Sequence, residues 1–261
     1  MTGGADGAAA WQVRADLRPG VLALTGHLGA AGTHAHAAVQ VLVCTRGAVL
    51  LGDGYRRAAV RAAVIPAGAR HCVTPDPGEP DPPQGWSLYV DTDGAAGQAL
   101  HRRAAERDAP PGAAVTRWAA AAAGLLTGPD GMPPADVLAV AERFGPPAEP
   151  RHPALSAALA RLPDALAAGG PVRITELAAR TGVSAGRLGH LFGEQLGLPF
   201  PAWVRWARLR AAMDAARGGA NLTEAAHAAG FADGAHLTRT FRAMFGITPS
   251  RALGGTHWQN R

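Results

Sequence analysis

The chain has 261 residues, of which 48% are hydrophobic, so it is long enough to bury the cores of two domains. No apolar run approaches the ~20 residues that a membrane-spanning helix needs, and no basic segment followed by an apolar stretch opens the chain, so neither a membrane partner nor a secretory signal is expected. The net charge of +5 is uneven, because residues 151–261 carry 13 arginines against 6 acidic residues and residues 1–150 carry 12 against 14, so we expect the C-terminal half to meet a polyanion.

Residues 11 to about 91 have the pattern of short strands. Brief apolar runs are separated by Gly, Pro and Asp, which is typical of a β-barrel or sandwich. The runs are VQVLVC (39–44), AVLL (48–51), AAVIP (62–66) and WSLYV (86–90). The Pro-rich segment 75–85 is predicted to be a loop between two of these strands.

Three histidines and a glutamine in this stretch are candidate ligands. His34 and His36 are two residues apart, and on a strand they face the same side, about 6.6 Å apart. Both imidazoles can then reach one ion, with His71 from a separate strand as a third ligand and Gln40 as a weak fourth. Three interpretations stay open for these residues: a divalent metal site, a metal-free effector pocket, and purely structural histidines.

The histidine-bearing segments resemble the two sequence motifs of cupin barrels, here His34-x-His36-x3-Gln40-x6-Gly47 and Pro66-x-Gly68-x2-His71. The resemblance covers about residues 15–92 and implies a cupin-like, effector-binding domain, which we assign to 11–95. Gln40 stands where metal-binding cupins usually carry Glu, and Pro75 replaces the final Asn of the second motif. Regulatory cupins often bind small molecules without a metal, so the resemblance fixes no cofactor and leaves a divalent metal ion as one alternative.

The two cysteines are Cys44 and Cys72. Cys72 follows His71 and on a strand therefore points to the opposite face. We expect both thiols to pack in the core in reduced form, as in a cytoplasmic protein. A softer metal site that uses a thiolate is the open alternative.

From about residue 98 the pattern becomes helical. The helical segments ALHRRAAER (99–107), TRWAAAAAGLL (116–126) and ADVLAVAERF (135–144) are separated by Pro and Gly breaks. The segment GPPAEPRHP (145–153) is predicted to be a linker, because successive prolines remove backbone donors and extend the chain. We assign 96–152 to a helical linker that is the candidate dimerisation surface or relay.

The C-terminal half contains a repeat. Residues 174–199 and 222–248 each open a short helix with Thr-Glu, turn at a glycine, and continue into a longer helix that ends in Phe-x4-Gly. Short helix, turn and longer helix is the helix-turn-helix layout. Gly182 and Gly230 are predicted to be left-handed at the turns. The expected caps and inward-facing residues are Ser184, Asp233, Leu188, Leu191, Phe192, Leu237, Phe241 and Phe245.

A further helix is predicted over 200–219, between the two copies. Pro201 suits its first turn, and Gly218–Gly219 end it. A stiff helix of about 16 residues spans about 24 Å, and successive major-groove faces recur about every 34 Å. One rigid chain can therefore place two recognition helices in adjacent major grooves of double-stranded DNA.

The arrangement closely resembles the DNA-binding domain of AraC/XylS-type transcription regulators, over about residues 153–253. The matching motifs are ELA (176–178), S-x3-L-x2-LF (184–192), RLRA (208–211) and GFAD-x3-L-x-R-x-F-x3-FG-x-TP (230–249). Many regulators of this family carry a cupin-like sensor domain. The resemblance implies a two-domain fold, with an N-terminal cupin-like β-barrel and an all-α tandem helix-turn-helix domain joined by a helical linker. It also implies a small-molecule or metal effector, a homodimer as one arrangement, and contact with RNA polymerase if the regulator is an activator.

Candidate DNA contacts are the outward positions of the two recognition helices. They are Gly186, Arg187, Gly189 and His190 in the first helix, and Ala235, His236, Thr238, Arg239 and Arg242 in the second. Arg239 is the candidate for a base contact, since arginine bonds guanine O6 and N7 together. Arg187 and Arg242 are candidate phosphate contacts, which position without specifying. Gly186 and Gly189 stand where the family often carries large base-reading side chains, so the first helix is expected to read less sequence.

Two functions compete on this evidence. The first is a ligand-responsive, sequence-specific transcription regulator, in which no residue is catalytic. The second is a cupin metalloenzyme resembling a dioxygenase, in which His34, His36, Gln40 and His71 hold a catalytic iron or nickel and the helical domain is an appendage. The tandem repeat favours the regulator, because an enzyme does not need two spaced recognition helices.

Overall fold

The computed structural model describes residues 12–105, 112–125, 132–144, 151–253 and 256–258. The chain divides into two compact units, one of residues 1–146 together with 242–261 and one of residues 147–241. The boundary falls inside a helix, so the last turn of that helix belongs to the first unit. The predicted two-domain fold, sheets first and helices after, is confirmed.

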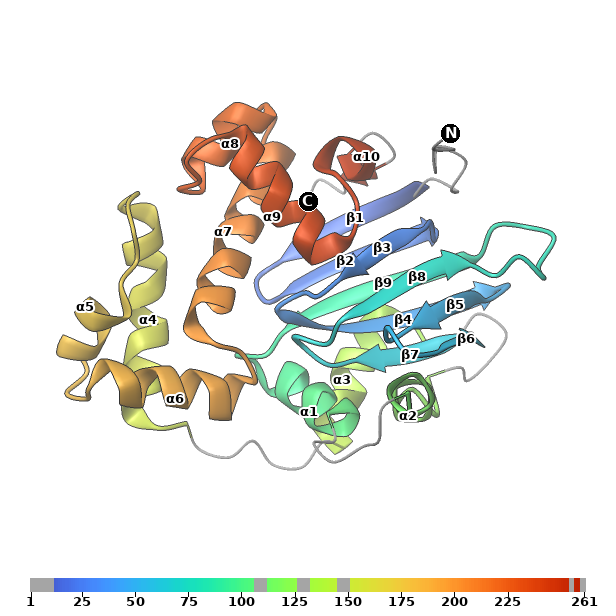
Figure 1. Cartoon of the computed structure of the whole chain (residues 1–261), viewed down its shortest axis with the longest axis horizontal. Coiled ribbons are helices and arrows are strands. Elements are labelled where there is room, and N and C mark those ends of the chain that lie inside the picture. Colours follow the sequence, from blue (N-terminus) through green and yellow to red (C-terminus); the bar gives the residue numbers. More distant parts are fainter. Residues whose placement is uncertain (1–11, 106–111, 126–131, 145–150, 254–255, 259–261) are drawn as a thin grey trace. The chain divides into compact units, whose positions relative to one another are not determined.

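Two sheets form the body of the first unit (Figure 1). The six-stranded sheet has the order β10-β1-β2-β9-β4-β7 and the four-stranded sheet the order β3-β8-β5-β6. Neighbouring strands are antiparallel except for the parallel pair of β1 and β10. The strands are β1 (Gln12–Arg18), β2 (Val21–His27), β3 (Ala31–His34), β4 (Ala38–Arg46), β5 (Val49–Gly52), β6 (Arg57–Val60), β7 (Ala62–Ile65), β8 (His71–Pro75), β9 (Gln84–Asp91) and β10 (Thr256–Trp258).

The strands differ in whether one face or both faces are covered. In β4 every residue from Ala38 to Cys44 is buried, since one face lines the interior and helices pack on the other side of this sheet. In β1 exposed and buried residues alternate, because one face meets solvent. The continuous apolar runs named from the sequence became β4, β5, β7 and β9. Of the predicted loop 75–85, residues 76–83 lie between β8 and β9, whereas Pro75 ends β8 and Gln84 begins β9.

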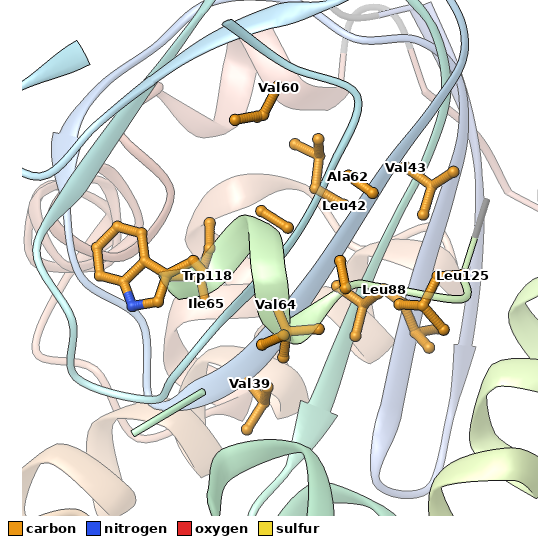
Figure 2. Close-up of a cluster of buried hydrophobic side chains, with 14 of the residues drawn as sticks. Val39, Leu42, Val43, Val60, Ala62, Val64, Ile65, Leu88, Trp118 and Leu125 are labelled. Atoms are coloured by element: carbon orange, nitrogen blue, oxygen red, sulfur yellow. The ribbon is translucent and has the colours of Figure 1, made fainter. Parts of the chain in front are cut away.

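Three helices follow the strands. They are α1 (Ala95–Ala104), α2 (Ala114–Ala121) and α3 (Pro134–Phe144), each overlapping one predicted helical segment. Of these, α1 and α2 pack against β7, and α3 packs against α1. Trp118 of α2 and Leu125 after it belong to the same buried cluster as Leu42, Val64 and Leu88 of the sheet, as Figure 2 shows. Of the predicted linker 145–153, residues 145–150 lie outside the described residues.

Helices make up the rest of the described chain. They are α4 (Pro153–Ala167), α5 (Ile174–Ala179), α6 (Ala185–Leu196), α7 (Phe200–Arg217), α8 (Leu222–Ala228), α9 (Gly234–Phe245) and α10 (Pro249–Leu253). The predicted repeat is confirmed as α5–α6 and α8–α9, with α7 between them. A core around Phe192 and Leu155 joins α4, α5, α6 and the start of α7. None of the helices in the described ranges is both long and apolar enough to cross a membrane.

Candidate functional site

The α5–α6 unit has the local geometry that its sequence predicts. Gly182 is left-handed at φ 72°, and the Ser184 side chain accepts a hydrogen bond from the backbone N–H of Arg187 at 3.2 Å. Leu188, Leu191 and Phe192 are buried, as predicted. The turn and cap therefore set the start of α6, and the buried face sets which side chains point outward.

The outer face of α6 carries little free positive charge. Gly186, Arg187 and His190 are exposed and Gly189 is half-buried. The Arg187 guanidinium lies 3.6 Å from a carboxylate oxygen of Glu194, and His190 Nε2 lies 2.9 Å from the other. Glu194 was not among the predicted residues, although its spacing of four from His190 is the usual signal for a pair on one helix face.

The α8–α9 unit repeats this geometry with stronger caps. Asn221 and Glu224 form a reciprocal capping box at the start of α8. Gly230 is left-handed at φ 73°, and Asp233 accepts from the backbone N–H of His236. The predicted inward residues Leu237, Phe241 and Phe245 are buried. In both copies a left-handed glycine and a capping side chain precede the longer helix, and the same face of that helix is buried.

The outer face of α9 presents two arginines. Arg239 and Arg242 are exposed, and neither guanidinium is held by a hydrogen bond or ion pair in the described part of the chain. Ala235 is exposed beside them. The Thr238 hydroxyl donates to the Gly234 carbonyl at 2.8 Å, and the His236 ring packs edge-on against Phe231 with ring centroids 5.2 Å apart. Of the five predicted positions on α9, three are therefore open to a partner and two are engaged locally.

Arg208 of α7 is hydrogen-bonded to the segment ahead of α5 and lies near the turn that follows α8. Its Nη2 donates to the Gly170 carbonyl, ahead of α5, at 2.6 Å. A Cβ added to Gly230, just after α8, would lie 3.5 Å from the Arg208 Nε. The 18 residues of α7 span about 27 Å at about 1.5 Å per residue. The sequence places Arg208 in the RLRA motif, but nothing in its position along the chain predicts a hydrogen bond to Gly170.

The four predicted ligands of the first unit come together in its interior. His34 ends β3 and lies opposite His71, the first residue of β8, in the strand register. Gln40 lies in β4. The prediction that His34 and His36 share a strand is wrong, because β3 ends at His34 and His36 lies in the connection to β4. Their rings still converge, with centroids 4.1 Å apart for His34 and His71, 4.9 Å for His36 and His71, and 5.7 Å for His34 and His36.

Each side chain of this histidine cluster (His34, His36, His71 and Gln40) is hydrogen-bonded on its outer side. The Nδ1 atoms lie 2.7 Å from the Gly32 carbonyl, 2.7 Å from the Ala38 carbonyl and 2.9 Å from the Ala69 carbonyl, in chain order of the histidines. Gln40 Oε1 lies 3.0 Å from Nε2 of both His36 and His71. Gln40 Nε2 donates to Ser87 Oγ at 2.7 Å and to the Tyr89 hydroxyl at 3.3 Å.

Burial keeps the histidine cluster uncharged. Desolvation, with a smaller contribution from His36, lowers the pKa of His34 to about 4. Burial also lowers the pKa of His36, and burial together with the neighbouring imidazoles lowers the pKa of His71 well below its usual value. Burial raises the pKa of Tyr89 to about 12. At neutral pH the cluster therefore offers neutral imidazoles, a neutral amide and a neutral phenol.

The cysteines lie apart from the histidine cluster. Cys72 follows His71 in β8 and is paired with Gly52 of β5, where an added Cβ would lie 2.8 Å from the Cys72 Sγ. Burial raises the pKa of Cys44 to about 12, so this thiol stays protonated. Both are free and buried, as predicted. Within the described ranges no cysteine joins the group of His34, His36 and His71 that could hold a metal ion.

The last turn of α9, which belongs to the first unit, packs beside the histidine cluster. The Gly32 N–H donates to the Gly246 carbonyl at 3.2 Å, and the Ala35 N–H donates to the Ala243 carbonyl at 3.3 Å. A Cβ on Gly246 would lie 2.9 Å from His34 Nδ1. The Phe245 ring packs edge-on against Tyr89, with centroids 5.3 Å apart. The backbone on both sides of His34 is thus tied to this turn.

Comparison with known proteins agrees with the geometry of the C-terminal helices. Residues 177–254 match the profile of a helix-turn-helix domain. A segment of 110 residues, 42% of this chain, is 36% identical to the HTH-type transcriptional regulator GlxA of Rhizobium meliloti strain 1021. The chain spans about a third of the length of that relative, 32%. The match therefore concerns part of each chain, and the name of the relative describes a transcriptional regulator.

The fold of the whole chain is similar to that of ToxT from Vibrio cholerae. One ToxT structure covers 94% of this chain and 98% of ToxT with a TM-score of 0.51 and 10% identity. Another, of ToxT bound to (E)-4-(8-methylnaphthalen-1-yl)but-3-enoic acid, covers 95% and 99% with a TM-score of 0.55 and 10% identity. At this identity the likeness concerns the fold, which has a sheet unit followed by a helical unit in both proteins.

Proposed function

We propose that this chain, whose C-terminal helices form a helix-turn-helix domain of the AraC type, is a sequence-specific DNA-binding transcription regulator. Residues 153–253 bind double-stranded DNA, with α6 and α9 in adjacent major grooves. Residues 11–95 form the effector-binding domain, and residues 96–152 form the relay or dimerisation region. The excess of arginine in residues 151–261 supports a polyanionic partner.

The observation that carries the proposal is the pair of unpartnered arginines on α9. Arg239 and Arg242 are three residues apart and project from the face opposite the buried Leu237 and Phe241. A long cationic side chain without a partner in the described structure is suited to a partner outside the chain. We assign Arg239 to a base edge and Arg242 to a phosphate, because arginine at the centre of a recognition helix reaches guanine in the major groove.

The α6 helix has a smaller role in this proposal. Arg187 and His190 share the carboxylate of Glu194, so a phosphate contact by Arg187 requires it to exchange one partner for another. Gly186 and Gly189 offer no side chain to read a base. We assign Arg187 to phosphate contact and His190 to the single base contact available on α6.

We assign the effector response to the histidine cluster. It is buried and polar, and its neighbours Phe245 and Gly246 are the last residue of α9 and the residue that follows it. An occupant that moves His34 or Tyr89 therefore acts directly on residues continuous with the reading helix. ToxT, which shares the fold, has been solved with a small organic acid bound. A coupling of about 1–3 kcal/mol is sufficient for regulation.

The test is DNA binding by the full chain after selection of a site from randomised duplexes. Arg239→Ala is expected to weaken binding to the selected site by about 1–3 kcal/mol, or roughly 5- to 150-fold, and to relax the preference at one base pair. Fluorescence anisotropy against salt concentration measures both. Arg161→Ala, which removes the same charge from an exposed position on α4, is the matched control.

Three outcomes separate the assignments. Loss on the selected site with little loss on random DNA supports a base contact by Arg239. Equal loss on both DNAs would make Arg239 a phosphate contact. A selection that recovers no preferred site would contradict sequence-specific binding altogether.

A further inference from the structure

The imidazole of His190, on the outer face of α6, is held at one of its two nitrogens. Its Nε2 lies 2.9 Å from a carboxylate oxygen of Glu194, four residues further along the helix. An ionised carboxylate only accepts, so Nε2 carries a hydrogen and donates it. A neutral imidazole has one donor and one acceptor nitrogen, so the lone pair of the neutral ring is on Nδ1.

The Nδ1 atom of His190 is available to a partner outside the chain. Within the described residues the imidazole makes no hydrogen bond or ion pair other than the one to Glu194, and the side chain keeps 64% of its accessible surface. On the same helix face, Gly186 and Gly193 carry no side chain, and a Cβ added at either would meet nothing within 4 Å. A base edge can therefore approach the ring without displacing another side chain of α6.

The carboxylate that orients His190 has a cost for DNA binding. The other oxygen of Glu194 lies 3.6 Å from the Arg187 guanidinium, so one carboxylate is shared by two side chains of this face. A negative charge near the phosphate backbone weakens binding to every DNA sequence alike, because like charges repel. What Glu194 supplies in return is a fixed tautomer of His190.

A single acceptor on a recognition helix selects one class of base edge. In the major groove the exocyclic amino groups of adenine (N6) and cytosine (N4) donate, whereas guanine O6 and N7 and thymine O4 accept. A ring nitrogen with a lone pair bonds an amino group and is repelled by a carbonyl oxygen. Arginine has only donors, so Arg239 of α9 is suited to the opposite class.

We propose that His190 reads the exocyclic amino group of an adenine or a cytosine through Nδ1, and that Glu194 is the positioning residue that keeps Nδ1 an acceptor. This rests on the proposed function, because it names what α6 selects in the DNA. The two recognition helices then read complementary chemistry, with an acceptor edge for Arg239 and a donor edge for His190.

The test begins with base selection by the full chain from randomised duplexes. It is carried out at about pH 8, above the range in which imidazoles usually change charge. We expect the wild type to prefer adenine or cytosine at one base pair, and His190→Ala to lose that preference. His227→Ala, which removes an exposed histidine from α8, is the matched control and should keep it.

Removing the amino group from the DNA tests the same contact with the protein unchanged. Purine in place of the adenine, or 2-pyrimidinone in place of the cytosine, should weaken wild-type binding about 3- to 10-fold, the size of one neutral hydrogen bond. Fluorescence anisotropy measures the loss, and the base that was selected decides which analogue is used. The analogue should change the affinity of His190→Ala by less than about 2-fold, because both changes remove the same contact. Equal losses in the two chains would overturn the inference.

Two variants test the positioning role of Glu194. Glu194→Ala lets the ring adopt either tautomer, so the preference for an amino group should fall, while affinity for random DNA should rise because a negative charge is gone. Glu194→Gln keeps an oxygen that accepts from the Nε2 hydrogen and should restore most of the preference. A role in helix stability alone would change the urea unfolding of α6 and leave the base preference as it is, which would overturn the positioning role.

The selected site separates this inference from the proposed function. A site that depends on Arg239 alone, or one in which His190 selects guanine or thymine, would overturn the inference and leave the regulator. Loss of a cytosine preference in Glu194→Ala but not in His190→Ala would also overturn it, since Glu194 would then read the base itself. A selection that recovers no preferred site would contradict the inference and the regulator together.

Discussion

The α5–α6 unit and the α8–α9 unit have the same buried pattern and different outer faces. Counted from the cap, Leu188 corresponds to Leu237 and Phe192 to Phe241, and these four side chains are buried. On the outside, His190 corresponds to Arg239 and Gly193 to Arg242. The inner positions are held by packing in both units, whereas the outer positions are free to differ.

Under the proposed function, this difference implies an unequal division of DNA reading between the two copies. A helix-turn-helix unit must bury one face to hold its angle, so that face tolerates little change. Its outer face contributes binding only where it carries side chains that reach the DNA. On α6 the outer positions are three glycines and a histidine and arginine paired with Glu194, so the proposed function gives α9 the larger share of the reading.

The largest expected effect comes from breaking the shared inner pattern. Phe192→Ala and Phe241→Ala should each destabilise their unit by about 3–5 kcal/mol, since each deletes a buried aromatic ring and leaves a cavity. Urea unfolding, with hydrogen exchange to locate the affected helices, measures the loss. A cost below about 1 kcal/mol in one unit and not the other would show that the two scaffolds are not equivalent.

Removing the link between the units should have the next largest effect. Arg208→Ala deletes the hydrogen bond to the Gly170 carbonyl and the guanidinium that lies near Gly230, and is expected to cost about 1.5–3 kcal/mol of stability. On DNA that contains the sites of both α6 and α9, we expect the variant to bind more weakly than its loss of folding stability alone would explain. Arg205→Ala, an exposed position on the same helix, is the control, and equal losses in both variants would rule out a linking role.

Placing an arginine on α6 at the position that corresponds to Arg239 tests whether the outer side chains alone decide how much of the DNA sequence each helix reads. His190→Arg places an arginine at the position that corresponds to Arg239. We expect a gain of about 1–3 kcal/mol on duplexes reselected for this variant, with a new guanine preference in the α6 half-site. Selection from randomised DNA shows it directly. An unchanged half-site would mean that α6 is placed differently on DNA.

The smallest expected effect is on the helix propensity of α6. Gly193→Ala should stabilise the α5–α6 unit by about 0.5–1 kcal/mol, because glycine is a poor helix former and an added Cβ meets nothing within 4 Å. Gly189→Ala should gain less, since its Cβ would lie 3.4 Å from Ile174 Cδ1. Thermal unfolding of both variants compares them. Loss of stability in Gly193→Ala would point to a contact of α6 that the described residues do not include.

Much of the helical half could be predicted because its signals are local. The caps Ser184 and Asp233 and the turns at Gly182 and Gly230 depend on residues only a few positions away. The strands buried on both faces were found from their continuous apolar runs. The alternating strand β1 was not named, since one polar face weakens the apolar signal that a short strand offers.

The histidines show where prediction from the sequence ended. Their spacing predicts that the residues of the cluster come together, but the prediction that His34 and His36 share one strand is wrong for His36. What brings the rings together is the pairing of His34 with His71 across β3 and β8, together with a turn that carries His36. Strand register over some forty residues of chain is set by core packing and not by local propensity.

The sequence by itself determined the two-domain order, the tandem helix-turn-helix repeat, its caps and its buried faces, because these follow from periodicity and near-neighbour hydrogen bonds. Only the tertiary structure decided which groups meet across long separations. It placed Gln40 Oε1 between two imidazoles, Arg208 against the Gly170 carbonyl, and Gly246 against His34. These contacts depend on how packed elements are positioned in space, which no pattern of residue types along the chain specifies.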